Sequence, residues 1–131
     1  METRHRNVVD SSGWLEWLVG SEAGKNFAHP IIDVENLVVP SVVLYEIQKK
    51  LLVEGIDRET AARAMNGILH GTLVDLNQRI AFDAAQLAFE HKLAMADAII
   101  LATAREHQAT LYTQDVHFRG IPGVKFFGKT P

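Results

Sequence analysis

The chain has 131 residues, 47% of them hydrophobic and 22% charged, which is the composition of an ordinary globular protein. This length predicts one domain, spanning residues 1–131, around a single layered core. Because the chain has no cysteine, disulfides and thiolate metal sites are excluded. The formal net charge of −3 argues against a broad basic patch that grips duplex phosphates non-specifically.

The N-terminal segment predicts a protein without a leader. It reads METRHRN and then turns apolar for only Val8 and Val9, which is too short for the apolar stretch of a signal peptide. No uninterrupted apolar run approaches the length of a membrane span. We therefore expect a cytoplasmic protein that does not enter the membrane.

The first half of the chain alternates short apolar runs with helical patterns. The predicted elements are a strand at 7–10, a helix at 11–20, a short helix at about 22–28, a strand at 37–39, and a helix that Ser41 caps and Gly55 ends. In the last of these, apolar residues exceed the single stripe that one core-facing side requires. Such an excess predicts a protein interface.

The second half repeats the alternation. Its predicted elements are a helix from Asp57 to about His70 with Gly71 as C-cap, a strand at 72–76, a helix through Ile80, Ala84 and Leu87, a helix at 96–107, and strands at 110–115 and 124–127. Strands that alternate with helices predict an α/β fold. We expect a three-layer α/β/α sandwich with a mainly parallel central sheet.

Four acidic residues form the candidate site. Asp10 and Asp115 end predicted strands, while Glu46 and Asp97 lie near the starts of predicted helices. Because ligands bind beyond the carboxyl ends of the strands in open α/β sheets, we expect the four at one edge. Their mutual repulsion would be relieved by Mg²⁺ or Mn²⁺, which favour oxygen ligands. Without these four charges the remaining net charge is −3 + 4 = +1, so RNA is not excluded as a partner.

Each acid also has a simpler explanation. Asp10 and Asp115 fit Asx turns or helix caps, and Glu46 can pair with a lysine one helical turn later. Asp97 can cap its helix, although that helix is almost wholly apolar and offers no basic residue three or four places on. The prediction of a site therefore rests on the four acids together.

The segments that carry these acids resemble the PIN domain, in particular the VapC toxin ribonucleases. NVVDSSGWLEWL is similar to the opening strand and helix of that family, and VPSVVLYEIQKKL to its glutamate-bearing helix. HKLAMADAIILATA looks like the segment with the third acid, LYTQDVHF matches the pattern Thr-x-Asp-x-x-Phe, and IPGVKFF is similar to the closing strand. The resemblance covers essentially the whole chain.

The resemblance implies a metal-dependent endoribonuclease that hydrolyses RNA phosphodiesters and is neutralised by a small antitoxin protein; family members are often homodimers. Carried over to this sequence, it implies that Asp10, Glu46, Asp97 and Asp115 are catalytic residues that bind Mg²⁺ or Mn²⁺, with Ser12 and Thr113 as supporting polar residues. His117 and Arg119 are candidates for contacts to RNA.

Two positions depart from the family pattern. His117 stands where many relatives carry a fifth acid, and Lys92 stands where a glycine is common before the third acid segment. Two other functions stay open: a PIN domain that binds without turnover, which usually lacks a site acid, and a phosphoacceptor signalling domain. The second would need an acidic pair near Asp10, but two serines follow Asp10.

Overall fold

The structure is a computed structural model that describes residues 5–128. Residues 1–4 and 129–131 lie outside the described part. The first four belong to the N-terminal segment from which we predicted that the protein has no leader. Within residues 5–128, no helix is long and apolar enough to cross a membrane.

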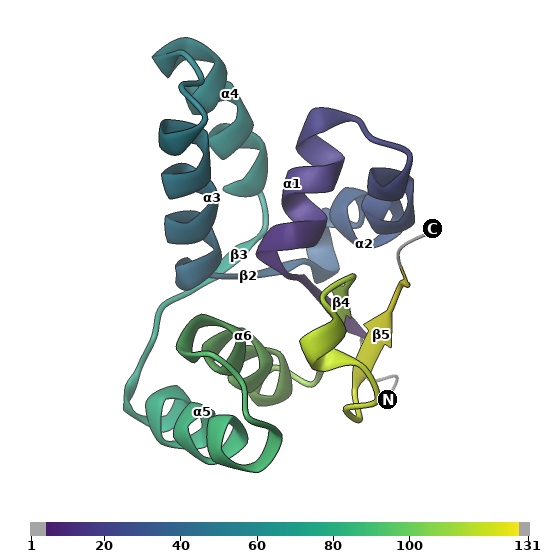
Figure 1. The fold of residues 1–131 in the computed structure, drawn as a ribbon, viewed down its shortest axis with the longest axis vertical. Helices are drawn as coiled ribbons and strands as arrows, with labels where there is room; N and C mark the ends of the chain where they lie inside the picture. Colours follow the sequence, from purple (N-terminus) through teal and green to yellow (C-terminus); the bar gives the residue numbers. More distant parts are fainter. Residues whose placement is uncertain (1–4, 129–131) are drawn as a thin grey trace.

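Five parallel strands form the centre of the fold (Figure 1). They are β1 (Arg6–Val9), β2 (Val38–Pro40), β3 (Thr72–Val74), β4 (Ala109–Thr113) and β5 (Val124–Phe126). Strand β4 lies between β1 and β5, while β2 pairs with β3. A parallel bridge between Asn7 and Leu37 connects the two groups at β1 and β2. Every strand pair is parallel, which confirms the predicted kind of sheet.

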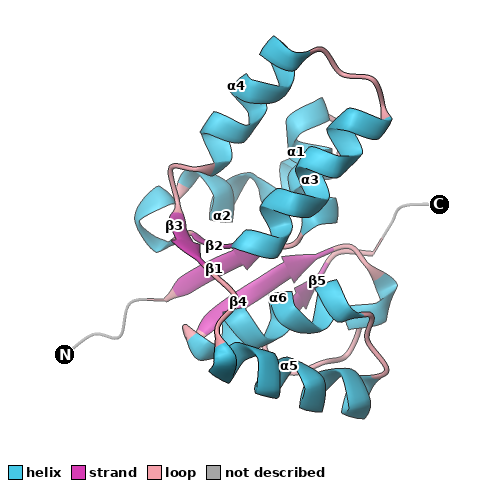
Figure 2. Ribbon diagram, turned by 90° about the vertical axis from the view of Figure 1, so that its left-hand side faces the viewer, coloured by secondary structure: helices cyan, strands magenta, loops and turns pink. Residues whose placement is uncertain are grey.

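Helices cover both faces of this sheet, as Figure 2 shows. They are α1 (Ser11–Val19), α2 (Ala28–Ile32), α3 (Ser41–Val53), α4 (Arg58–Ile68), α5 (Gln78–His91) and α6 (Met95–Glu106), with short 3₁₀ turns η1 (Ala23–Phe27), η2 (Val34–Asn36) and η3 (Val116–Phe118). Helices α1 to α4 lie on one side of the strands, and α5 and α6 lie on the other. The predicted three-layer α/β/α arrangement is confirmed.

Helix α6 is the central element of the second helical layer. All seven residues from Ala98 to Ala104 are buried, because α6 lies between α5 and the sheet. A helix that is apolar all round is expected in such a place. Fully burying side chains such as Ile100 and Leu101 stabilises the fold by about 1.5–3 kcal/mol each. The acid at the start of α6 is therefore held on a rigid element.

Several predicted helix ends were wrong by one or two residues. Pro40, the last residue of β2, is the N-cap of α3, so Ser41 is already helical. Helix α4 ends at Ile68 with Leu69 as its C-cap, and Gly71 instead allows a close approach to the β2 segment. A Cβ at Gly71 would lie 3.0 Å from the Leu37 carbonyl oxygen. Asp57 caps α4 as predicted, since its side chain accepts a hydrogen bond from the Thr60 amide.

The turn between α5 and α6 contains the lysine that replaces the usual glycine. Lys92 is the C-cap of α5 and adopts a left-handed conformation with φ of 56°. Glycine is favoured in this conformation because it has no Cβ to clash with the backbone. The turn is thus formed with lysine, at a cost in backbone strain of about 1–2 kcal/mol.

Candidate metal centre

Two of the predicted site residues lie at neighbouring strand ends. Asp10 follows β1 directly, and Asp115 comes two residues after β4. These strands pair in parallel with Val9 opposite Tyr112, and the Asp10 amide donates to the Tyr112 carbonyl at 3.2 Å. The two aspartates therefore lie at the same edge of the sheet, as predicted.

Asp10 is buried, with 3% of its surface exposed, and its carboxylate accepts four hydrogen bonds. Its carboxylate accepts from the Gly13 amide at 2.9 Å, from the Ser12 hydroxyl at 2.9 and 3.0 Å, and from the Thr113 hydroxyl at 2.6 Å. The Thr113 oxygen also accepts from the Asp115 amide at 2.9 Å. Asp10 is therefore the N-cap of α1, as the simpler explanation had it, and Thr113 links it to Asp115.

Glu46 is brought to this edge by the packing of α3 against α1. Its Oε1 accepts a hydrogen bond from the Ser11 hydroxyl at 2.6 Å. Lys50, one helical turn later, forms its ion pair with Glu54 at 2.8 Å, so lysine pairing does not explain Glu46. The sequence singled out Ser12 but missed Ser11. The consecutive serines were visible, but which of them faces α3 depends on tertiary packing.

Asp97 lies in the first turn of α6 and does not cap it. The N-cap is Ala94, and no side chain forms a capping hydrogen bond. Burial raises the pKa of Asp97 to about 6, and the negative charges of Asp115, Glu46 and Asp10 add to this rise. The helix-capping explanation is therefore wrong, and Asp97 lies close enough to the other three acids for their charges to raise its pKa.

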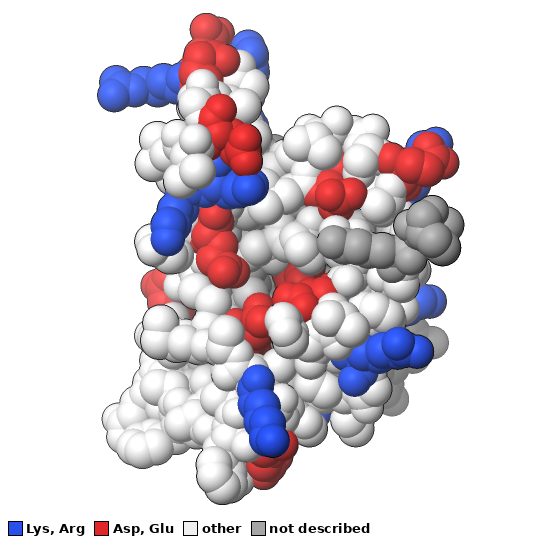
Figure 3. All heavy atoms as spheres, in the orientation of Figure 1, with Lys and Arg blue, Asp and Glu red and all other residues white. Residues whose placement is uncertain are grey.

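The pKa of Asp10 is raised in the same way as that of Asp97. Burial raises the pKa of Asp10 to about 6, although the bonds from Thr113, Gly13 and Ser12 oppose the rise, and the charge of Asp115 contributes to it. Within the described residues, no lysine or arginine forms an ion pair with any of the four acids. Figure 3 shows acidic atoms gathered in the hollow between the lower end of α3 and η3.

This donor set fits a hard divalent cation. Four carboxylates converge from four distant parts of the chain, and such ligands suit Mg²⁺ and Mn²⁺. Ligand atoms of Asp97, Asp115 and His117 all lie within 4.8 Å of one another. The His117 Nδ1 lies 2.8 Å from the Asp115 Oδ1, a contact that the sequence did not predict.

The sequence matches the family described as PIN domain over residues 8–124. This chain belongs to the PIN-domain family. The match covers all four acids and the whole of β2, β3 and β4; it begins at Val8 within β1 and ends at Val124, the first residue of β5. No curated protein matches the chain significantly.

Several solved structures share the fold of this PIN domain. A chain of a toxin–antitoxin complex from Klebsiella pneumoniae is 24% identical with a TM-score of 0.79, over 94% of this chain and 99% of that one. A chain of VapBC2 from Rickettsia felis, bound to a promoter DNA fragment, is 17% identical with a TM-score of 0.71, over 93% and 97%. A chain of DNA-bound VapBC from Salmonella typhimurium is 15% identical with a TM-score of 0.73, over 95% and 98%.

A groove opens beside the acids of this PIN domain. Its volume is about 580 Å³, and its lining includes Ser12, Gln114, Asp115 and Arg119. The Arg119 guanidinium lies 6.0 Å from the centre of the Phe126 ring. Gln114 and Gly128 also line a second hollow, of about 620 Å³, that reaches toward η1. Arg119 is thus near the acids, while Gln114 was not foreseen, because nothing in the sequence distinguished it from an ordinary loop residue.

Proposed function

We propose that this PIN domain is a metal-dependent endoribonuclease and the toxin of a VapBC-type toxin–antitoxin pair. The observation that carries this proposal is the convergence of Asp10, Glu46, Asp97 and Asp115 without an arginine or lysine partner among residues 5–128. Ion-pair networks normally explain acidic clusters in a stable fold. Among residues 5–128, His117 alone forms an ion-pair contact with one of these acids, Asp115, and a bound divalent cation would remove the remaining repulsion.

The four acids have distinct surroundings that suit a metal site. Asp10 is fixed by Thr113, Ser12 and Gly13, and Ser11 orients Glu46. Asp97 and Asp115 complete the set from α6 and from the turn after β4. Such a cation, when bound, lowers the pKa of its water and stabilises charge that develops on a phosphate. The protein side chains then have to hold that cation and keep the phosphodiester beside it.

RNA is the proposed substrate, and the groove beside the acids supports it. Arg119 places a guanidinium at the groove, where it can bind a phosphate oxygen. The aromatic ring of Phe126 belongs to the same lining and offers a surface on which a base can stack. Gln114 adds an amide to the same lining, where it can form hydrogen bonds to RNA.

The test is cleavage of RNA by the metal-stripped protein with and without Mn²⁺ or Mg²⁺. The variants Asp10→Asn, Glu46→Gln, Asp97→Asn and Asp115→Asn should each lose cleavage while they keep the fold. Asp83→Asn, at an exposed position of α5, is the matched control and should cleave normally. Unchanged cleavage in any two of the four site variants would mean that the nuclease site lies elsewhere.

The proposed antitoxin binds along α3. The solved structures that share the fold of this chain include chains of a toxin–antitoxin complex and of a VapBC complex. On α3, Leu52 is 66% and Val53 is 72% exposed, so the apolar excess seen in the sequence is partly at the surface. A hollow of about 200 Å³ beside them is lined by Glu46, Tyr45 and Val53. An antitoxin helix on this face would pass Glu46 and could direct a basic side chain into the acidic site.

Growth experiments test the toxin proposal. Expression of the chain alone should arrest growth, and co-expression with a small neighbouring gene should restore it. Harmless expression of an enzyme that cleaves RNA in vitro would remove the toxin proposal and leave the nuclease proposal intact. A chain that binds RNA without cleaving it would support the alternative of a PIN domain without turnover.

We propose in addition that the homodimer forms through α5. Phe82 is 70% and Phe89 is 83% exposed, and Met95, the first residue of α6, is 77% exposed. Four alanines of α5 line an apolar pocket of about 370 Å³, together with Leu76, Met95, Ala98 and Ile99. A two-fold axis at α5 would place the rings of each copy against the pocket of the other. With Leu76, the exposed apolar area is on the order of 500 Å² per copy, which reaches the roughly 1,000 Å² of a stable interface.

A further inference from the structure

His117 lies among the ligand atoms of the acidic site although it is not an acid. Its ring nitrogen and one carboxylate oxygen each from Asp97 and Asp115 lie within 4.8 Å of one another. Ligands of one cation at bonds of about 2.1 Å are at most about 4.2 Å apart. The three atoms therefore need only a small side-chain rotation to share an ion.

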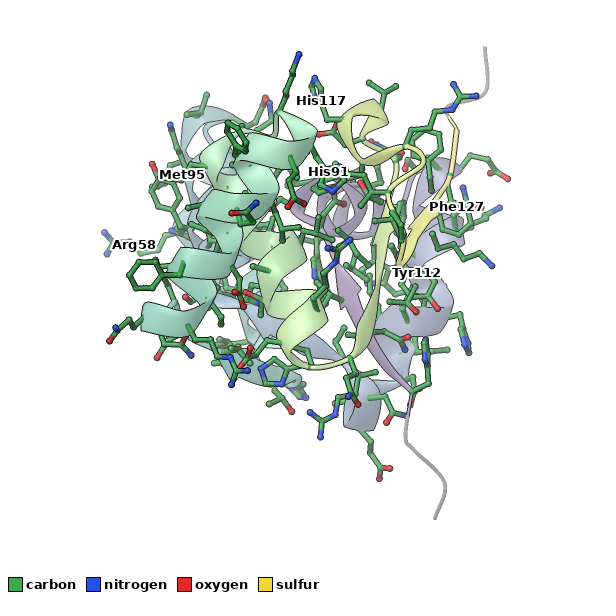
Figure 4. All side chains as sticks on the ribbon, turned by 90° about the horizontal axis from the view of Figure 1, so that it is seen from below. Arg58, His91, Met95, Tyr112, His117 and Phe127 are labelled. Carbon is green, nitrogen blue, oxygen red and sulfur yellow. The ribbon has the colours of Figure 1, made fainter. Side chains whose placement is uncertain are left out.

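The imidazole has the freedom to make this rotation. His117 is 69% exposed at its side chain, and Figure 4 shows it on the turn that leaves β4, at the rim of the molecule. Its backbone amide donates a hydrogen bond to Asp115 Oδ1 at 2.9 Å, and its Nδ1 lies 2.8 Å from the same oxygen. The second oxygen, Asp115 Oδ2, takes part in neither contact and is left for another ligand.

We propose that His117 is a nitrogen ligand of the cation at this site, and that it makes the site prefer Mn²⁺ or a later first-row transition ion over Mg²⁺. The inference rests on the proposed metal-dependent nuclease and specifies which ion that site selects. It also gives a role to His117, which stands where many PIN-domain relatives carry a fifth acid.

Coordination chemistry supplies the reason for this preference. Mg²⁺ demands near-ideal octahedral oxygen coordination and gives up its water reluctantly, so replacing an oxygen ligand by imidazole weakens its binding. Imidazole suits transition ions, whose affinities rise from Mn²⁺ toward Cu²⁺. Four carboxylates with one imidazole therefore discriminate against Mg²⁺, while an all-carboxylate site would accept both ions.

The experiment measures Mn²⁺ and Mg²⁺ affinity by titration calorimetry, and the electron spin echo of bound Mn²⁺, on tag-free full-length protein. Wild type should show nuclear modulation from a directly bound ¹⁴N. His117→Gln should lose that modulation and bind Mn²⁺ at least about tenfold more weakly, with Mg²⁺ affinity much less changed. His117→Asp restores an oxygen ligand and should shift the preference toward Mg²⁺.

His70→Gln is the matched control, because His70 precedes β3 and so lies toward the opposite edge of the sheet. Its Mn²⁺ affinity and ¹⁴N signal should equal those of wild type. If wild type binds Mn²⁺ without ¹⁴N modulation, or if His117→Gln keeps the modulation, the role of His117 is overturned and the four-carboxylate proposal stands. If wild type binds neither ion at millimolar concentration, both proposals fall.

Discussion

Replacing Asp97 by asparagine should stabilise the metal-free protein. Asp97→Asn keeps the shape of the side chain and removes the negative charge that Asp115, Glu46 and Asp10 repel. In most helices an aspartate in the first turn is favourable, because it interacts with the positive end of the helix. Here burial and the neighbouring acids outweigh that effect, so the variant should be the more stable protein at neutral pH.

The magnitude follows from the pKa of Asp97. A rise from 3.8 to about 6 corresponds to about 3 kcal/mol of cost for the ionised form in the folded state. Because Asp97 is partly exposed, solvent screening reduces this to about 1–2 kcal/mol. The folded pKa is raised, so the cost is absent below pH 3.8, grows as the pH rises to about 6, and is constant above that. The advantage of the variant should therefore appear between these two values.

Thermal unfolding at pH 4 and pH 7.5, after treatment with a chelator, measures this effect. At pH 7.5 the melting temperature of Asp97→Asn should be higher by roughly 3–8 °C, and at pH 4 the two proteins should melt together. Added Mn²⁺ at 100 times its dissociation constant should stabilise wild type by about 2.7 kcal/mol and the variant much less. An Asp97→Asn protein that melts at or below wild type at pH 7.5 would refute the repulsion argument.

Three further predictions concern the turn, the dimer and the strand ends. Lys92→Gly should raise the free energy of unfolding by about 0.5–1 kcal/mol in urea denaturation, because glycine adopts the left-handed conformation without strain. If the proposed homodimer forms through α5, Phe89→Glu should convert it to a monomer in sedimentation experiments, whereas Val19→Glu, at a residue that is 74% exposed on α1, should not. Thr113→Val should cost about 2 kcal/mol of stability and reduce RNA cleavage, since Asp115 N and Asp10 lose their shared hydroxyl; normal cleavage would show that this link is dispensable.

The fold could be predicted from the sequence because its pattern is local. Short apolar runs such as Val8–Val9 and the apolar stretch of α6 are determined by burial on both sides of a parallel sheet. The ends of α3 and α4 were less well predicted. There, a serine and a glycine suggested caps, but the backbone used Pro40 and Leu69, since tertiary packing of β2 decides where the helices begin and end.

The acids of the candidate site could also be read from the sequence, but not what holds them. Strand ends and helix starts indicated which edge of the sheet would carry Asp10 and Asp115. The partners Ser11 and Gln114, and the contact between His117 and Asp115, depend on side-chain directions across elements that are distant in the sequence. Periodicity carries no information about such contacts.

In the absence of a metal ion, the ionised acids of the site destabilise the folded protein. Total stabilities are about 5–15 kcal/mol, so a cost of a few kcal/mol at Asp10 and Asp97 is a substantial fraction. The buried apolar run of α6, the hydrogen bonds at Asp10 and the single hydrogen bond at Glu46 offset that cost. Because residues 10, 46, 97 and 115 meet only after folding, the unfolded chain offers a cation no comparable site. Metal binding should therefore stabilise the folded protein alone, by an amount that grows with the ratio of free ion concentration to dissociation constant.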